Sequence, residues 1–236
     1  MIYQWAKTVQ SCLFPPTCLL CGAAGDHDRD LCQGCHDDLP NNSSACARCA
    51  APLASAGVGT RVCGRCQHTP PAFDRAIAPL LYLPPVDFLV QELKFRGNLT
   101  AARLLGQLLG EALLCRSGPL PEAIVPVPLH RSRLRERGFN QAIELARPVA
   151  RQLEIPLLVD LVDRIRPSPP QSTLDLKARR GNVRGAFACR HGMNVRRVAI
   201  LDDVITTGST ADAMARVLRR AGAVEIEVWA CARTLG

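Results

Sequence analysis

Four closely spaced cysteine pairs limit what the first third of this chain can fold into. Each pair has the form CxxC, and successive pairs are separated by ten, ten and thirteen residues. The eight members are Cys18, Cys21, Cys32, Cys35, Cys46, Cys49, Cys63 and Cys66. Two CxxC turns complete a tetrahedral shell of four thiolates around a metal ion and leave no open position for catalysis. Four pairs within about fifty residues therefore favour structural zinc over redox dithiols.

Neighbouring pairs are expected to share a metal, so that the first two pairs bind one zinc ion and the last two bind another; an interleaved arrangement stays open. The segments between the pairs, such as "GAAGDHDRD", have little periodic apolar content. Zinc binding would supply the missing folding free energy, on the order of ten kcal/mol per site. The remaining cysteines are interpreted as small buried hydrophobic residues, with Cys12 also a spare ligand candidate. They are Cys12, Cys115, Cys189 and Cys231.

Length and charge narrow the class of protein further. The 236 residues suffice for an α/β domain of about 150 residues and a smaller module. The net charge of +8 favours phosphate-bearing partners, whereas an aromatic content of 4% argues against recognition of bases mainly by stacking. No apolar run approaches the roughly 20 residues of a membrane span. The N-terminus "MIYQWAKTVQSCLFPP" has a helical apolar stripe but not the pattern of a secretory signal, so a cytoplasmic location with reduced thiols is expected.

The pattern changes after residue 70, which predicts an N-terminal helix and double zinc ribbon over 1–70 and an α/β domain over 71–236. Helices are expected at 86–97, 98–115, 140–154 and 209–223, and Pro148 is expected to kink or break the third. Strands are expected at 123–129, 157–164, 185–189, 196–203 and 224–233. This alternation predicts a mostly parallel sheet, whose ligands bind at the carboxyl ends of the strands.

The stretch "ILDDVITTGST", residues 200–210, carries the most specific chemistry. Asp202 and Asp203 follow a buried strand at its carboxyl end, where carboxylates can accept hydrogen bonds from a sugar diol or hold Mg²⁺. The run from Thr206 to Thr210 precedes a helix, so its backbone N–H groups favour a phosphate, and Gly208 allows close approach. Together these features outline a ribose 5-phosphate site. A capped strand–turn–helix with solvated aspartates stays open as the alternative.

"VAILDDVITTGST" resembles the phosphoribosyl diphosphate (PRPP) loop of type I phosphoribosyltransferases. The stretches "LKFRGN", "IVPVPLHRSRLRERGFNQA" and "PPQSTLDLKARRGNVRGAF", with the CxxC ribbons in front, narrow the resemblance to the ComF family. Members of this family combine a double zinc ribbon with a phosphoribosyltransferase-like fold and are linked to natural competence and DNA uptake. The resemblance covers nearly the full chain and implies a sheet of the type I phosphoribosyltransferase kind.

The resemblance implies roles for particular residues. The ribose hydroxyls and Mg²⁺ would be bound by Asp202 and Asp203. The 5-phosphate would be bound by Thr206, Thr207, Gly208, Ser209 and Thr210. Candidates for the diphosphate are Arg135 and Arg137, with Lys94 and Arg96 near the site. From the residues alone, the segment 131–137 also fits an exposed basic loop without ligand, and Lys94 and Arg96 fit ordinary helix-end cations.

One departure from the enzymes concerns the diphosphate. Phosphoribosyltransferases usually hold it in a glycine-containing loop, but "VPVPLHR" has Pro126 and Pro128, which offer no N–H donor. PRPP binding is therefore better supported than turnover. The basic segment "LDLKARRGNVRG" is interpreted as a flap over the substrate or a track for a nucleic-acid backbone. Its cations are Lys177, Arg179, Arg180 and Arg184.

Two hypotheses follow. In the first, the chain is a phosphoribosyltransferase, a glycosyltransferase that transfers a pentosyl group, with PRPP and Mg²⁺ bound and the acceptor unidentified. In the second, it is a competence factor that binds single-stranded DNA through its ribbons and basic loops, with a regulatory or inactive PRPP site and partners in a DNA-uptake machinery. A purely structural scaffold fails to explain Asp202 and Asp203 and is the weakest alternative.

Overall fold

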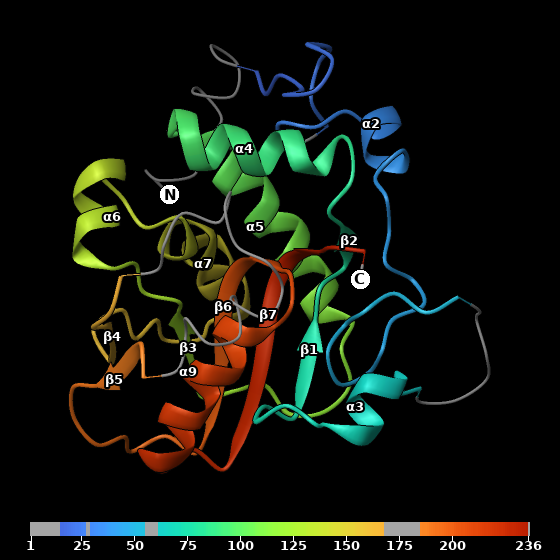
Figure 1. Ribbon diagram of the computed structural model, residues 1–236. Helices are drawn as coiled ribbons and strands as arrows, with labels where there is room; N and C mark the ends of the chain where they lie inside the picture. The colour runs from blue at the N-terminus through green and yellow to red at the C-terminus, as the bar shows by residue number, and fades with distance from the viewer. Residues whose placement is uncertain (1–14, 27–28, 55–60, 168–184, 236) are drawn as a thin grey trace.

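A parallel β-sheet forms the centre of the molecule, as the alternating sequence pattern predicts. The computed structural model describes residues 15–26, 29–54, 61–167 and 185–235. The strands lie in the order β1-β7-β6-β3, β2 also pairs with β7, and every pair is parallel (Figure 1). Their bounds are β1 Arg75–Ile77, β2 Leu80–Leu81, β3 Ala123–Pro126, β6 Arg197–Ile205 and β7 Glu225–Arg233. All five carboxyl ends therefore meet at one edge.

Helices cover both faces of this sheet. One apolar core joins β6 and β7 to α4, α5 and α7, and a second core joins the opposite face to α9. The bounds are α4 Val86–Arg96, α5 Leu99–Leu114, α7 Gln141–Leu153 and α9 Ser209–Arg220. Asn98 separates α4 from α5 and caps α5 by accepting from the backbone N–H groups of Thr100 and Ala101. None of the helices within the described ranges is long and apolar enough to cross a membrane.

Three details differ from the sequence-based expectation. The segment expected as a strand at 157–164 meets the main sheet at its start, where Leu157 forms an isolated parallel bridge with Ile124 of β3. The rest of it, β4 Val162–Arg164, pairs antiparallel with β5 Phe187–Cys189 in a separate two-stranded sheet. The basic segment expected as a loop is a short helix, α6 Arg131–Arg137, capped by the His130 side chain. The strand expected at 196–203 extends two residues further, because β6 continues to pair with β7 as far as Ile205.

Of the kink or break expected at Pro148, the break does not occur, and α5 makes room for the proline ring. Helix α7 continues from Gln141 to Leu153 with Pro148 inside it. Gly106 of α5 faces this ring: a Cβ there would lie 2.7 Å from the Leu145 carbonyl oxygen and closer still to Pro148 Cγ. Close packing between the two helices thus offsets the hydrogen bond that an interior proline removes.

The cysteine-rich segment packs along the β1–β2 edge of the sheet. Residues 40–42 pair with this edge: Leu81 N donates to Pro40 O at 2.7 Å, and Asn42 N donates to Pro79 O at 2.7 Å. Leu31 and Leu39 join the core on the α5 face, whereas Ala50 joins the core on the α9 face. The two ribbons, which contain the short helices α2 Gln33–Asp37 and α3 Gly64–His68, therefore contribute to opposite cores (Figure 1). The division of the chain at residues 70 and 71 stays a prediction.

The contact between α5 and α7 yields a matched pair of variants. Gly106→Ala should lower the free energy of unfolding by about 1–3 kcal/mol, because the new methyl group overlaps backbone and a rigid ring. Gly110→Ala on the same helix should be neutral or stabilise by up to about 1 kcal/mol, because its methyl group meets only the flexible end of Gln152 and alanine favours helix. Urea unfolding measures both. Equal effects of the two substitutions would contradict this packing.

Candidate functional site

The structure brings the eight cysteines together as two separate groups of four. Within each group the sulfur atoms all lie within 4.8 Å of one another, and the groups combine neighbouring CxxC pairs: Cys18, Cys21, Cys32 and Cys35, then Cys46, Cys49, Cys63 and Cys66. Cys21 Sγ lies 3.7 Å from Cys32 Sγ, and Cys49 Sγ lies 3.7 Å from Cys63 Sγ. Four sulfurs at about 2.3 Å from a tetrahedral zinc ion are about 3.8 Å apart. Both groups fit structural zinc, in the sequential arrangement.

Backbone N–H groups favour the thiolate form in both clusters. Burial raises the pKa of Cys18, but hydrogen bonds from backbone N–H groups outweigh it and bring the pKa down to about 6. The pKa of Cys46 falls to about 7 for the same reasons, and the N–H of Cys63 donates to its sulfur at 3.3 Å. Zinc binds the thiolate, and one cysteine of each cluster is thus favoured in this form, whereas the pKa values of Cys21, Cys35, Cys49 and Cys66 are raised. Outside the clusters, Cys231 is buried as expected, whereas Cys115 is exposed.

The two aspartates lie side by side at the carboxyl end of β6. The N–H of Asp203 donates to Asp202 Oδ1 at 2.9 Å, and the N–H of Val204 donates to Asp203 Oδ1 at 2.9 Å. Both carboxylates therefore bend along the backbone instead of pointing straight out on opposite faces. Asp203 is buried, with 4% of its surface exposed, whereas Asp202 is half-buried. The strand geometry thus leaves Asp202 as the more accessible acid.

Lys94 pairs with Asp203, and Arg96 does not reach the acidic pair. The Lys94 ammonium contacts Asp203 Oδ2. Burial lowers the pKa of Lys94, but the charge and hydrogen bond of Asp203 outweigh it, so that the pKa is raised overall. Arg96, two residues further along α4, points to solvent and pairs with Glu92 at 3.3 Å, because residues two apart face different sides of a helix. Of the two candidates in "LKFRGN", the structure brings only Lys94 to the aspartates.

Asp202 is held in an unfavourable electrostatic position. Burial and the adjacent charge of Asp203 raise its pKa well above the ordinary value of an aspartate. Arg164, at the end of β4, lies close enough for the charge of Asp202 to act on its guanidinium, and its guanidinium carbon lies 5.4 Å from the Phe187 ring centroid. Sequence reasoning missed Arg164, because only the folding of β4 and β5 brings this arginine to the carboxyl edge.

Of the two arginines predicted to hold an anion, only Arg137 approaches the acidic pair. Burial lowers the pKa of Arg137 and the charge of Asp203 partly restores it, which places this guanidinium within electrostatic reach of Asp203. Its Nη1 donates to Gln141 Oε1 at 2.6 Å, so the side chain is held at the junction of α6 and α7. Arg135 is exposed on α6. Lys94, Arg137 and Arg164 together surround the aspartates with positive charge.

The run 206–210 forms a turn that leads directly into α9. Gly208 adopts a left-handed conformation with φ of 76°, which glycine accepts without strain. Thr207 Oγ1 and Ser209 Oγ lie 2.7 Å apart, and the N–H of Ser209 donates to Thr207 Oγ1 at 3.3 Å. Within the described residues, no acceptor takes the N–H groups of Thr206, Thr207, Gly208 or Thr210. Four unpaired donors at a helix start form a suitable environment for an anion.

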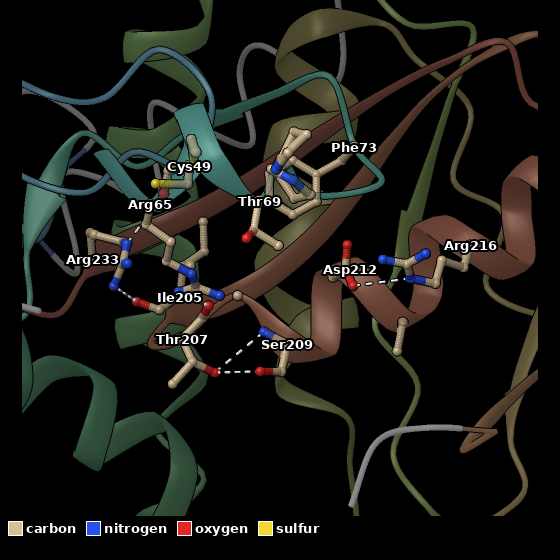
Figure 2. Close-up of a pocket in the computed structure, with 15 residues that line it drawn as sticks. Cys49, Arg65, Thr69, Phe73, Ile205, Thr207, Ser209, Asp212, Arg216 and Arg233 are labelled. Carbon is tan, nitrogen blue, oxygen red and sulfur yellow. Dashed lines mark hydrogen bonds and ion pairs between the residues drawn. The ribbon is translucent and has the colours of Figure 1, made fainter. Parts of the chain in front are cut away.

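A cavity of about 480 Å³ separates this turn from the second ribbon. The turn and the outer side of α9 form one wall, and the second cysteine cluster with α3 forms another (Figure 2). Pro70, Pro71 and Phe73 make part of the lining apolar. The cavity reaches Thr207, Gly208 and Ser209 of the turn, but Asp202 and Asp203 do not line it. The turn 206–210 thus lies between Asp202 and Asp203 of β6 in the sequence before it and the second zinc ribbon across the cavity.

Two four-cysteine clusters packed against a parallel sheet define a double-zinc-ribbon protein with an α/β fold. Residues 9–67 match the family model described as "Double zinc ribbon domain". Competence protein F of Haemophilus influenzae is 37% identical over 210 residues, which cover 86% of this chain and 90% of that protein. DNA utilization protein YhgH of Escherichia coli K12 is 35% identical over 209 residues, covering 87% and 91%. The chain belongs to the family of these two proteins, which confirms the resemblance to the ComF family.

Solved structures give weaker likenesses. Glutamine phosphoribosylpyrophosphate amidotransferase from B. subtilis is 22% identical over 55% of this chain and 26% of that chain, with a TM-score of 0.36. Purine phosphoribosyltransferase from Pyrococcus horikoshii is 19% identical over 62% of this chain and 83% of that chain, with a TM-score of 0.29.

Three sequence-based predictions lie outside the described residues. They are the expected N-terminal helix, the spare ligand candidate Cys12, and the basic segment with Lys177, Arg179, Arg180 and Arg184.

The two aspartates should respond to substitution in opposite directions. Because its raised pKa means that ionised Asp202 costs folding free energy, Asp202→Asn should stabilise the protein at pH 8 by about 1 kcal/mol, or about 2–4 °C. The cost shrinks as the pH falls and Asp202 takes up a proton, so the gain should be smaller at pH 5. Thermal unfolding at both pH values measures it.

Asp203→Asn should instead destabilise by about 2 kcal/mol, because it leaves the Lys94 ammonium partly buried without its counter-charge. The double variant Lys94→Met with Asp203→Asn should recover most of this loss. Stabilisation by Asp203→Asn alone would contradict the pairing of Lys94 with Asp203.

Proposed function

We propose that this protein binds PRPP with Mg²⁺ at the carboxyl edge of its sheet. The observation that carries the proposal is the adjacency of two side-by-side carboxylates with a turn whose N–H groups have no acceptor among the described residues. A sugar phosphate presents matching groups, with a phosphate at one end and vicinal hydroxyls at the other. The sequence of the loop, which resembles a PRPP loop, supports the same ligand.

In this proposal the turn from Thr206 to Thr210 binds the 5-phosphate. Its amides supply several N–H donors, and the hydroxyl groups of Thr207 and Ser209 lie close enough to one another to donate to the same anion. The dipole of α9, twelve residues long, adds a favourable potential at this end. Gly208 has no Cβ that would keep the phosphate away from the backbone.

In this proposal Asp202 and Asp203 accept hydrogen bonds from the ribose hydroxyls and are ligands of Mg²⁺. Carboxylate oxygens are the donors that Mg²⁺ prefers in proteins, and a bound Mg²⁺ would neutralise charge on the diphosphate. Lys94 already neutralises Asp203, so Asp202 is the carboxylate that gains most from a cation. A cation or a hydroxyl donor would relieve the repulsion that raises the pKa of Asp202.

Side chains rather than backbone amides are the proposed diphosphate ligands. Pro126 and Pro128 have no N–H, and the N–H of Val127 between them donates to Leu201 O at 2.9 Å. Residues 126–128 therefore offer the diphosphate no free amide, and Arg137 of α6 lies where the charge of Asp203 acts on its guanidinium. Arg135 would join only if the ligand extends toward solvent. Binding is the core of this proposal; transfer of the pentosyl group to an acceptor would make the protein a phosphoribosyltransferase.

Calorimetry with PRPP and Mg²⁺ tests the assignment. The double variant Asp202→Ala, Asp203→Ala should weaken binding by about 100-fold or more, since it removes charge-assisted hydrogen bonds to the ribose and the metal ligands. Asp37→Ala with Asp38→Ala is the matched control, because these two adjacent aspartates are exposed at the end of α2. Unchanged affinity in the first variant would refute the ribose site.

A second function, binding of single-stranded DNA in a cytoplasmic DNA-uptake machinery, is favoured by the names and sequence identity of the relatives. The net charge of +8 and the exposed arginines of α6 would provide the electrostatic attraction. In this case the PRPP site would regulate DNA handling or be inactive. The zinc ribbons would contribute further to the DNA-binding surface.

The salt dependence of DNA binding tests this second function. Affinity for an oligonucleotide should fall steeply with salt, and Arg131→Ala with Arg135→Ala should reduce the log–log slope by about 1.4, or about 0.7 per lost phosphate contact. Arg151→Ala, on the exposed end of α7, is the control and should leave the slope unchanged. A salt-independent affinity, or no binding at low salt, would exclude the function.

A further inference from the structure

Arg65 connects the second cysteine cluster to the turn 206–210. This arginine lies in α3, between the ligand residues Cys63 and Cys66. Its Nη1 donates to the carbonyl oxygen of Thr207 at 2.9 Å. The contact spans 142 positions of the chain, so only the folded arrangement of ribbon and sheet creates it.

Arg233 makes a second connection from the same cluster. It is buried, with 4% of its surface exposed, at the end of β7. Its Nε donates to the carbonyl oxygen of Cys49 at 3.2 Å, and its Nη1 donates to Ile205 O at 3.1 Å and contacts Thr206 O (Figure 2). The two arginines therefore contact three successive carbonyl groups at the start of the turn.

Holding these carbonyls determines where the following N–H groups point. In a trans peptide the C=O of one residue and the N–H of the next lie in one plane and point in opposite directions. Fixing the carbonyls of residues 205–207 therefore turns the N–H groups of Thr206, Thr207 and Gly208 away from the arginines. These are N–H groups without an acceptor among the described residues. The arginines thus select the conformation in which the turn presents its donors.

The other hydrogen bonds of the turn, between Thr207 and Ser209 and from the N–H of Asp212 to Gly208 O, are local to the turn and the start of α9. The residues of the turn are small, and Gly208 has a wide range of accessible backbone conformations in the unfolded turn. Ordering each residue of such a segment costs about 1–2 kcal/mol, which would reduce the affinity for an anion if binding had to supply it. Hydrogen bonds from Arg65 and Arg233 offset this cost before the ligand arrives. Their positive charge behind the turn also favours an anion in front of it.

The first cysteine cluster has no comparable connection to the turn within the described residues. Its segment forms ion pairs with α5 instead, from Asp30 to Arg103 and from Arg29 to Glu111. Leu31 and Leu39 pack into the core on the α5 face, away from α9. The two clusters are therefore structurally inequivalent with respect to the proposed phosphate site.

We infer that the second cysteine cluster acts on the proposed phosphate site through Arg65 and Arg233, two positioning residues that orient the amides of the turn 206–210. Anion binding at the turn then depends on an intact second ribbon, and the first ribbon has a stabilising role only. This inference rests on the proposed function for the identity of the ligand, but the order of the turn can be measured without any ligand.

Arg65→Met tests the inference, because methionine keeps most of the aliphatic stem and removes the guanidinium. Amide hydrogen exchange of the full-length, zinc-loaded protein should become faster in peptides that cover 205–210, with zinc content unchanged. PRPP affinity with Mg²⁺ should fall about tenfold, the loss expected for one charge-assisted hydrogen bond. Arg48→Met is the matched control: Arg48 has the equivalent place in the "CARC" turn and, among the described residues, no hydrogen bond to 205–210. It should leave exchange and affinity unchanged.

A second pair of variants tests the metal itself. Cys46→Ser in the second cluster and Cys21→Ser in the first should each reduce the zinc content by about one ion per chain. Exchange at 205–210 should accelerate with Cys46→Ser and remain at the wild-type rate with Cys21→Ser. Equal acceleration in both would show a general loss of stability and overturn the inference.

The outcomes separate the two proposals. If the wild-type protein binds no PRPP, the proposed function fails, whereas faster exchange in Arg65→Met still supports the connection between ribbon and turn. If the wild-type protein binds PRPP and Arg65→Met matches it in both exchange and affinity, the inference is overturned while the proposed function stands. Rescue of both readouts by Arg65→Lys would show that charge at this position suffices.

Discussion

The parallel pairing of β6 with its neighbours is the constraint on which the candidate site depends. Because β3, β6 and β7 run in the same direction, the aspartates, the proline-rich connection and Arg233 all reach one edge of the sheet. An antiparallel neighbour would place the corresponding residues at the opposite end of the molecule. Ile200 and Leu201 of β6 are fully buried in the cores on the two faces of the sheet. This packing stabilises β6 and so keeps two adjacent carboxylates together near its carboxyl end.

That edge carries electrostatic strain that the rest of the fold offsets. Two neighbouring carboxylates in a partly buried position repel each other, and Lys94 compensates for only one of them. Arg137 and Arg164 lie near enough for the charges of Asp203 and Asp202, respectively, to act on their guanidinium groups. A site that costs folding free energy in the absence of ligand is typical of a binding function, because the ligand or metal recovers that cost.

The double zinc ribbon is more than a neighbouring module in this arrangement. One cluster adds Cys18, Leu31 and Leu39 to the core on the α5 face, and the other adds Ala50 to the core on the α9 face, so the ribbons cover the β1–β2 edge from both sides. The hydrogen bonds of Arg65 and Arg233 extend this contact to the turn before α9. The same zinc-dependent segment that completes the two cores thereby supports the backbone of the proposed phosphate site.

The sequence by itself determined what local spacing controls. Each CxxC turn brings its own two sulfurs together, and the order of the pairs favoured the two sequential four-cysteine groups, while the structure decided between this and an interleaved arrangement. The strand, acidic pair, glycine turn and helix of "VAILDDVITTGST" were likewise predicted, since all of them are formed by neighbours in the chain. Only the tertiary structure decided which distant side chains meet this motif. Lys94 rather than Arg96, the unexpected Arg164, the helical form of 131–137 and the connection from Arg65 depend on helix phase and on packing between segments far apart in sequence. Such contacts follow from the whole set of buried surfaces, which no local pattern specifies.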